Sequence, residues 1–321
     1  MEPKLEVVMY HYVRDLPASA YPRLKGMLLS DFRQQVTELR REYEMATLES
    51  ALAFLEGTYT PHRNLCLLTF DDGLREHYAD VAPLLAEQRI AGLFFLITEC
   101  LEHGRVAPVH MNHFLMASMD FSEYRRQLWA RIAELDSRGV PACDAHVARQ
   151  AYSWDSEEVA QFKYVFNFLL DPALRDVAVA QLFEERIGPE AEFSSDLYLS
   201  WTEARQMQDW GMVMGGHSHQ HRPLAALSAC ELSGDLGECR RLLSERLSAQ
   251  MFWPFCYPYG RRHSFTPDAV SLLRALGFSC AFSTEAGANQ PGEDRFALRR
   301  TDCKRAGVRG NRADQFLKVS A

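Results

Sequence analysis

Near residue 70 the chain changes abruptly from apolar to acidic. Residues 65–70 read Leu-Cys-Leu-Leu-Thr-Phe, and residues 71–73 read Asp-Asp-Gly. A strand inside a parallel sheet is buried on both faces, so its sequence is continuously apolar rather than alternating. The run therefore predicts a buried parallel strand with two carboxylates at its carboxyl end.

Strand-like and helix-like segments alternate on both sides of this run. The order strand, helix, strand is typical of α/β folds, either a barrel or a doubly wound sheet. The other predicted strands are Leu5–Met9, Gly92–Ile97, Met212–Met214, Phe252–Tyr257, Phe278–Phe282 and Phe296–Leu298. Helices are expected between them, among them residues 74–89 and 201–210.

The alternation stops between residues 100 and 195. No buried-strand run occurs there, and apolar residues recur at helical spacing, as in Phe121–Leu135 and Val159–Leu170. We therefore expect a single domain over residues 1–321 with a helical insertion at 100–195. The basic tail after Lys304 is expected to be loosely held.

Composition excludes several classes of protein. With 35 Lys and Arg against 43 Asp and Glu, the net charge is −8, which disfavours a nucleic-acid partner. No run approaches the roughly 18 apolar residues of a membrane span, and acidic residues near the N-terminus are unlike an export signal. The eight cysteines are scattered without CxxC pairs, as in a protein with reduced thiols. These features predict a cytoplasmic protein without a transmembrane segment.

The adjacent carboxylates of Asp71 and Asp72 are the first candidate for chemistry. Active sites of α/β barrels lie at the carboxyl ends of the strands. Two neighbouring carboxylates repel each other, and a cation or a proton relieves the repulsion. The alternative is that Asp72 only caps the helix that follows.

Three histidines within five residues form the second candidate. His217, His219 and His221 follow the predicted strand Met212–Met214. Imidazole nitrogens are good ligands for transition metals, and on a helical turn His217 and His221 would lie on the same side. One carboxylate would complete a triad with open positions for water and substrate. An exposed polar loop is the alternative.

A third candidate is the segment Cys256-Tyr257-Pro258-Tyr259-Gly260, again at a strand end. Pro258 restricts the backbone and Gly260 allows it to turn, which could present the Tyr259 N–H to a reacting group. A plain turn fits this segment equally well.

Taken in this order, the three segments resemble the polysaccharide deacetylases of the NodB-homology type, carbohydrate esterase family 4. The motifs that carry the resemblance are Thr-Phe-Asp-Asp-Gly at residues 69–73 and His-Ser-x-x-His at residues 217–221. The resemblance covers about residues 5–100 and 197–303 and omits the insertion. It implies a distorted (β/α) barrel.

The resemblance also implies an activity and a set of roles. It implies hydrolysis of the N-acyl amide of an amino sugar or glycan precursor, with one divalent metal, zinc as first candidate. Asp72, His217 and His221 would hold the metal, Asp71 would be the general base, and the Tyr259 N–H would stabilise the oxyanion.

The sequence departs from the family pattern at two positions. Cys256 stands where the third motif usually has the arginine that orients the base. The stretch Leu298-Arg299-Arg300 replaces the usual Leu-x-His, whose histidine is the general acid. Arg299 or Arg300 is expected to orient Asp71 instead, because arginine is a poor proton donor.

The general acid must then come from elsewhere in the chain. His11, at the end of the first strand, has the best location, although a buried histidine bonded to backbone is an equal alternative. The other candidates are His263 and the pair His110 and His113, of which His110 is also expected to line the substrate pocket.

Two other functions stay open. One is hydrolysis of a small non-sugar amide, as in the metal-independent, allantoinase-like branch of the family. The other is a non-catalytic glycan-binding relative that kept the fold and lost the acid.

Overall fold

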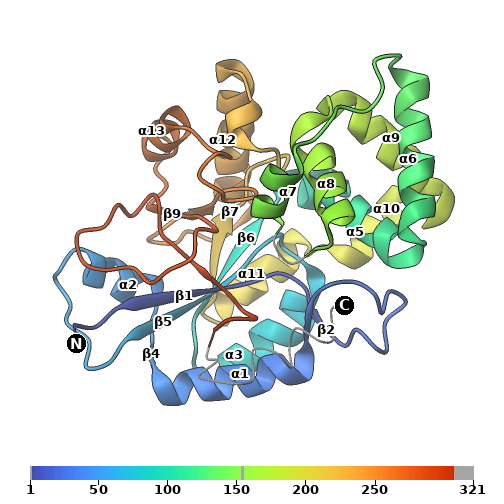
Figure 1. Ribbon diagram of the computed structural model, residues 1–321. Helices are drawn as coiled ribbons and strands as arrows, with labels where there is room; N and C mark the ends of the chain where they lie inside the picture. Colours follow the sequence, from blue (N-terminus) through green and yellow to red (C-terminus); the bar gives the residue numbers. More distant parts are fainter. Residues whose placement is uncertain (1, 153–154, 307–321) are drawn as a thin grey trace. The chain divides into compact units, whose positions relative to one another are not determined.

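The computed structural model describes residues 2–152 and 155–306, which form two compact units (Figure 1). The first unit takes in the chain up to residue 15, residues 25–104 and the chain from residue 195 onward. The second takes in residues 16–24 and 105–194. Most of the tail expected to be loosely held, residues 307–321, lies outside the described residues.

The first unit contains the sheet. Its elements, in chain order, are β1 (Leu5–Tyr10), β2 (Val13–Arg14), β3 (Met27–Leu28), α1 (Leu29–Glu42), β4 (Glu44–Met45), α2 (Leu48–Leu55), β5 (Leu65–Phe70), the π-helical turn η1 (His77–Val81), α3 (Ala82–Glu87), β6 (Gly92–Leu96), α4 (Thr98–His103), α11 (Trp201–Asp209), β7 (Val213–Gly216), the 3₁₀ turn η3 (Leu224–Ala226), α12 (Ala229–Arg246), β8 (Pro254–Cys256), α13 (Pro267–Ala275), β9 (Cys280–Phe282) and β10 (Thr301–Asp302).

Within the described part of the chain, eight strands form one parallel sheet. Its order is β10-β1-β5-β6-β7-β8-β9, and β4 also pairs with β5. A single parallel bridge joins Phe282 of β9 to Leu298, three residues before β10. The two ends of the sheet therefore approach each other. This arrangement confirms the predicted α/β class and the distorted barrel.

The apolar run of β5 has the double burial that its sequence predicts. Cys66, Leu68 and Phe70 pack in the layer between the sheet and the helices. Leu65 and Leu67 point the other way, into a second cluster inside the curled sheet. All five of these apolar side chains are fully buried, and the polar residue of the strand, Thr69, is buried with its hydroxyl donating to the Val8 carbonyl.

The last predicted strand, Phe296–Leu298, is wrong. The final strand is β10, Thr301–Asp302, which pairs with Val8 and Met9 of β1. Phe296 and Leu298 are almost completely buried in the two apolar clusters. Their apolar character reflects this packing and not a strand ladder.

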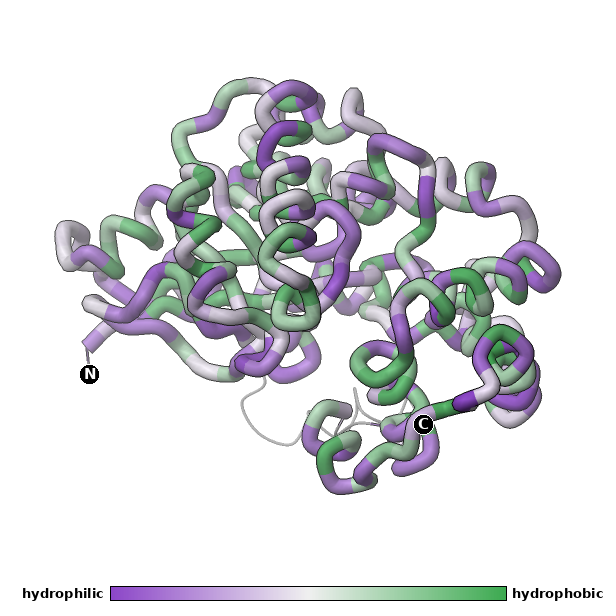
Figure 2. The backbone as a smooth tube through the Cα atoms, turned by 90° about the horizontal axis from the view of Figure 1, so that it is seen from above, coloured by the Kyte–Doolittle hydropathy of each residue, from purple (hydrophilic) through white to green (hydrophobic). Residues whose placement is uncertain are grey.

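The predicted helices of the first unit are present, although residues 74–89 contain the π-helical turn η1 and the short helix α3, and several of the helices begin at a side-chain cap. In α2, α11 and α12 a Thr or Ser precedes the helix and forms a reciprocal capping box with the third helical residue. Figure 2 shows hydrophobic and hydrophilic residues alternating along the helices, as expected for elements with one buried face. None of the described helices is both long and apolar enough to cross a membrane.

The second unit is helical. Its elements are α5 (Pro108–Ser118), α6 (Phe121–Leu135), α7 (Ala145–Ala151), α8 (Glu157–Tyr164), the π-helical turn η2 (Val165–Leu169), α9 (Pro172–Arg186) and α10 (Glu190–Leu197), the last extending past the boundary. Residues 16–24 join this unit, where the Arg23 guanidinium donates to the carbonyls of Ala117 and Met119. The domain boundaries expected from the sequence, a 100–195 insertion in one domain, stay a prediction.

Candidate active site

Parallel strands bring their carboxyl ends to one end of the sheet, and the candidate residues follow these ends. Oδ1 of Asp72 lies 3.4 Å from Nε2 of His217 and 3.6 Å from Nε2 of His221. The two Nε2 atoms are 3.2 Å apart. Ligands at about 2.0–2.1 Å from a tetrahedral zinc are about 3.4 Å from one another. The three buried atoms thus form a triangle of the size that one tetrahedral metal ion requires.

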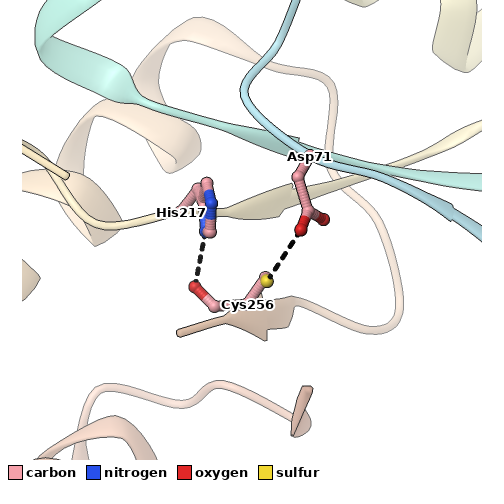
Figure 3. A group of neighbouring side chains, drawn as sticks. All are labelled: Asp71, His217 and Cys256. Carbon is pink, nitrogen blue, oxygen red and sulfur yellow. Dashed lines mark hydrogen bonds between the residues drawn. The ribbon is translucent and has the colours of Figure 1, made fainter. Parts of the chain in front are cut away.

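The ring of His217 is oriented by the backbone of a neighbouring strand. Its Nδ1 lies 2.8 Å from the carbonyl oxygen of Cys256 in β8 (Figure 3). This contact makes Nδ1 the protonated nitrogen and leaves the Nε2 lone pair directed at Asp72. Burial acts to lower the pKa of His217, but Cys256, Asp72 and Asp71 outweigh it and raise the pKa well above its usual value. The surroundings of this ring therefore favour a cation at Nε2, which is either a second proton or a metal ion bound through the lone pair.

The motif that carries His217 and His221 is a loop and not a helical turn. Ser218 and His221 have φ values of 61° and 54°, which a helix does not allow. The Ser218 hydroxyl accepts a hydrogen bond from the His221 N–H at 2.8 Å. The two imidazoles meet because the loop reverses at these residues, so the expected helical turn is wrong although the rings do share a side.

Strained backbone is concentrated at this site. Among the described residues, five non-glycine residues have positive φ, and four of them are Asp72, Ser218, His221 and Tyr259. Each such residue costs of order 1–3 kcal/mol and persists only where the surroundings enforce it. This concentration is typical of a functional site.

Asp71 is held by Arg300. The guanidinium donates from Nη1 to Oδ1 at 2.7 Å and from Nη2 to Oδ2 at 2.8 Å, and both side chains are buried. Burial acts to raise the pKa of Asp71, but Arg300 and His11 outweigh it and lower the pKa to about 2. The carboxylate is therefore ionised at neutral pH. Arg299 instead pairs with the partly exposed Glu293.

Cys256 lies beside this ion pair. Its Sγ is 3.5 Å from Oδ2 of Asp71 (Figure 3). The sulfur also accepts a hydrogen bond from Nη2 of Arg300 at 3.0 Å. Asp71, His217 and Cys256 are also grouped closely enough to hold a metal. The Arg300 cation already contacts the carboxylate and the sulfur, which disfavours a second cation there. Burial raises the pKa of the Cys256 thiol.

His11 follows β1 at the same end of the sheet. Its Nε2 lies 3.6 Å from Oδ2 of Asp71, and 44% of its side chain is exposed. The backbone carbonyl of His11 accepts a hydrogen bond from Nε2 of the buried His77 at 2.8 Å. Burial lowers the pKa of His77 to about 4, so it remains a neutral donor. The ring of His11 thus reaches both the base and solvent.

Tyr259 lies beside the histidine loop. Its ring is 5.2 Å from that of His221, and its carbonyl accepts from the Thr284 hydroxyl at 2.9 Å. The next residue, Gly260, has φ +58°, and a Cβ there would lie 2.6 Å from the Thr284 backbone nitrogen. Only glycine allows this close approach, which holds the Tyr259 turn against β9.

Three other predicted residues are in different surroundings. His110 is almost completely buried in α5 of the helical unit, and His113 belongs to the same helix. His263 is exposed in the segment after Gly260. For His110 a role in substrate binding stays a prediction.

Sequence reasoning missed Asp235 of α12. Its carboxylate accepts hydrogen bonds from the backbone N–H groups of His219 and Gln220, between the two histidines of the triangle. A signal was available in the sequence, since Asp235 interrupts the buried stripe of Leu232, Leu236 and Cys239 at helical spacing. A buried carboxylate in such a stripe needs a partner.

Comparison with protein families gives a match to this same part of the chain. The family model described as "Polysaccharide deacetylase" matches residues 58–148 and 177–281, more than half of the sequence. These ranges include Asp71, Asp72, His217, His221 and Cys256. No curated protein matches the chain.

Solved structures share the fold at low sequence identity. IcaB from Ammonifex degensii is 21% identical, with a TM-score of 0.57 over 99% of this chain and 98% of that one. The Streptococcus pyogenes deacetylase PplD in complex with acetate is 14% identical, with a TM-score of 0.59 over all of both chains. The BpsB deacetylase domain from Bordetella bronchiseptica is 15% identical, with a TM-score of 0.55 over 94% of this chain and 98% of that one. The resemblance inferred from the motifs is thereby confirmed: the chain belongs to the polysaccharide deacetylase family and is a hydrolase of carbon–nitrogen bonds other than peptide bonds.

Proposed function

We propose that this protein is a metal-dependent deacetylase that hydrolyses the N-acyl amide of an amino sugar or glycan precursor. The observation that carries the proposal is the triangle of Asp72, His217 and His221, whose ligand atoms are spaced for one tetrahedral ion. Two imidazoles and one carboxylate suit zinc and its neighbours and leave positions open for water and substrate. A divalent ion bound there would polarise the amide carbonyl and activate water.

The other side chains supply proton transfer and orientation. Asp71, ionised and held by two hydrogen bonds from Arg300, is the general base that accepts the proton of the attacking water. Arg300, which immediately precedes β10, acts by orienting this carboxylate. The Tyr259 N–H donates a hydrogen bond to the developing oxyanion.

His11 is the proposed general acid. It is the histidine whose side chain contacts Asp71 at 3.6 Å while remaining open to solvent. The imidazolium donates a proton to the leaving nitrogen, so that the amine departs neutral. Because Arg300 occupies the position of the family's usual acid motif, the acid comes from β1 instead of the β9–β10 segment.

Metal content tests the ligand set. The purified wild-type protein should contain or take up about one divalent ion per chain, measured by elemental mass spectrometry, and His217→Ala should lose it, because two ligands hold the ion poorly. Chelation should abolish hydrolysis of N-acetylated amino sugars, and zinc should restore it.

His219→Ala is the matched control, since His219 is in the same loop but outside the triangle, and its Nδ1 contacts Thr98. It should retain the metal, because the bonds of the His219 N–H to Asp235 and of its carbonyl to Glu99 do not involve the imidazole. A wild-type protein that takes up no metal yet hydrolyses small amides would favour the allantoinase-like alternative. Sugar binding without any acetate release would favour the non-catalytic one.

Leaving-group dependence tests His11. His11→Gln should lower kcat for an N-acetylated amino sugar by about 100- to 10,000-fold, the usual contribution of a positioned acid. An aryl acetate ester should be far less affected, because its phenolate leaves without protonation. Equal losses on both substrates would exclude His11 as the acid, and metal content serves as the control for an intact site.

The proposal extends to a cytoplasmic location and a soluble or carrier-linked amino-sugar precursor as substrate. The cytoplasmic location is supported by the eight cysteines, all of which are free and five of which are buried. Free thiols in this number suit a reducing compartment. Fractionation of the native host cells tests the location.

A further inference from the structure

Two of the proposed metal ligands depend on a loop that is strained at both ends. His217 and His221 are separated by Ser218, His219 and Gln220, and φ is positive at both Ser218 and His221. Such a backbone does not hold itself in place, because each residue with positive φ favours another conformation by about 1–3 kcal/mol. Contacts from outside the loop must therefore enforce it.

One set of contacts comes from the start of α4. The Thr98 N–H donates to the Ser218 carbonyl at 3.3 Å, and the Glu99 N–H donates to the His219 carbonyl at 3.0 Å. The Thr98 hydroxyl also lies 2.9 Å from Nδ1 of His219. These bonds satisfy the carbonyl groups of Ser218 and His219. The backbone N–H groups of His219 and Gln220 need acceptors from another element.

Asp235 of α12 accepts hydrogen bonds from both of these N–H groups. Its Oδ1 accepts from the His219 N–H at 2.9 Å, and its Oδ2 accepts from the Gln220 N–H at 2.9 Å. The side chain is only 7% exposed and projects from α12, which belongs to a different part of the chain from α4. Each carboxylate oxygen therefore has its own backbone partner.

We propose that Asp235 is a positioning residue that sets the separation of His217 and His221 and thereby the affinity and geometry of the metal site. It contacts neither imidazole of the triangle and acts through the backbone between them. The inference rests on the proposed metal site. It adds a residue that controls metal affinity without itself binding the metal. Hydrogen bonds that orient the ligands of a metal from outside typically change metal affinity by about 10- to 100-fold.

Asp235→Asn is the decisive variant because it keeps the size of the side chain. An amide has one acceptor oxygen, so its NH₂ group must face one of the two backbone N–H donors. The zinc Kd, measured by competition with a chromophoric chelator, should rise about 10- to 100-fold. The absorption bands of the Co²⁺-loaded variant should also shift, because they report the arrangement of the ligands around the ion.

Glu238→Gln is the matched control on the same helix. Glu238 pairs with Arg241 at the surface, so this variant should keep the wild-type Kd and Co²⁺ spectrum. If the wild type binds zinc and Asp235→Asn binds it equally well with the same spectrum, the role of Asp235 is excluded while the metal site stands. If the wild type binds no metal, the proposed function itself fails.

A measurement on the wild type covers the case in which Asp235→Asn does not fold. Amide hydrogen exchange should be slow at the His219 and Gln220 N–H groups, because both donate to the buried carboxylate of Asp235. Exchange at the rate of exposed loop amides would overturn the proposal without recourse to any variant.

Discussion

Asp71→Asn should abolish turnover while leaving the metal in place. Loss of a general base costs about 100- to 10,000-fold in kcat, and Asp71 is not one of the three atoms of the triangle. Steady-state hydrolysis of an N-acetylated amino sugar and metal content per chain measure the two effects. Retained turnover would exclude Asp71 as the base.

The same substitution should weaken the fold, because it leaves the buried Arg300 without its counter-charge. Removal of one partner from a buried ion pair costs about 3–5 kcal/mol. Denaturant unfolding measures this loss. Activity must therefore be compared under conditions in which the denaturant unfolding curve shows that the variant is folded.

Arg300→Met should lower stability about as strongly as Asp71→Asn. The substitution leaves the Asp71 carboxylate buried without the two hydrogen bonds that hold it, and the free energy of unfolding should fall by about 3–5 kcal/mol. The double variant Asp71→Asn/Arg300→Met should recover part of this loss, since no buried charge remains. A double-mutant cycle gives the coupling energy directly.

Arg300→Met should also move the pH dependence of activity. Arg300 is the main influence that lowers the pKa of Asp71 to about 2 against burial, which acts to raise it. Without the guanidinium the pKa rises, and the acid limb of kcat/KM shifts to higher pH. Arg299→Met is the control, because its exposed pair with Glu293 is worth about 0–1 kcal/mol. An unmoved acid limb in Arg300→Met would contradict the orienting role.

The sequence predicted the strands best where burial dictates composition. A strand covered on both faces is almost entirely apolar, so the run of β5 and the acidic residues at its end could both be recognised in the sequence. Leu298 shows the limit of this signal. It is as apolar as a strand residue, but it fills the interior of the barrel and makes one bridge, which local composition does not distinguish from a strand.

Arg299 and Arg300 could not be separated from sequence because neighbours along an extended chain point to opposite faces. The structure separates the two, because Arg300 is buried against Asp71 and Arg299 pairs with the partly exposed Glu293. The histidine loop is a similar case, since spacing predicts proximity of His217 and His221 but not the backbone that creates it. Asp235 was missed because its partners are main-chain groups, which carry no residue identity.

The pairing of β10 with β1 has a consequence for how the protein is made. Val8 is synthesised almost three hundred residues before its partner Thr301. The carboxylate of Asp71 likewise has no ion-pair partner until Arg300 has been synthesised. Contacts between residues far apart in the sequence are slow to form, and domains begin to fold during translation. We therefore expect the nascent chain to carry an open, inactive sheet until residues 300–302 emerge, so that hydrolytic competence is acquired only when β10 pairs with β1.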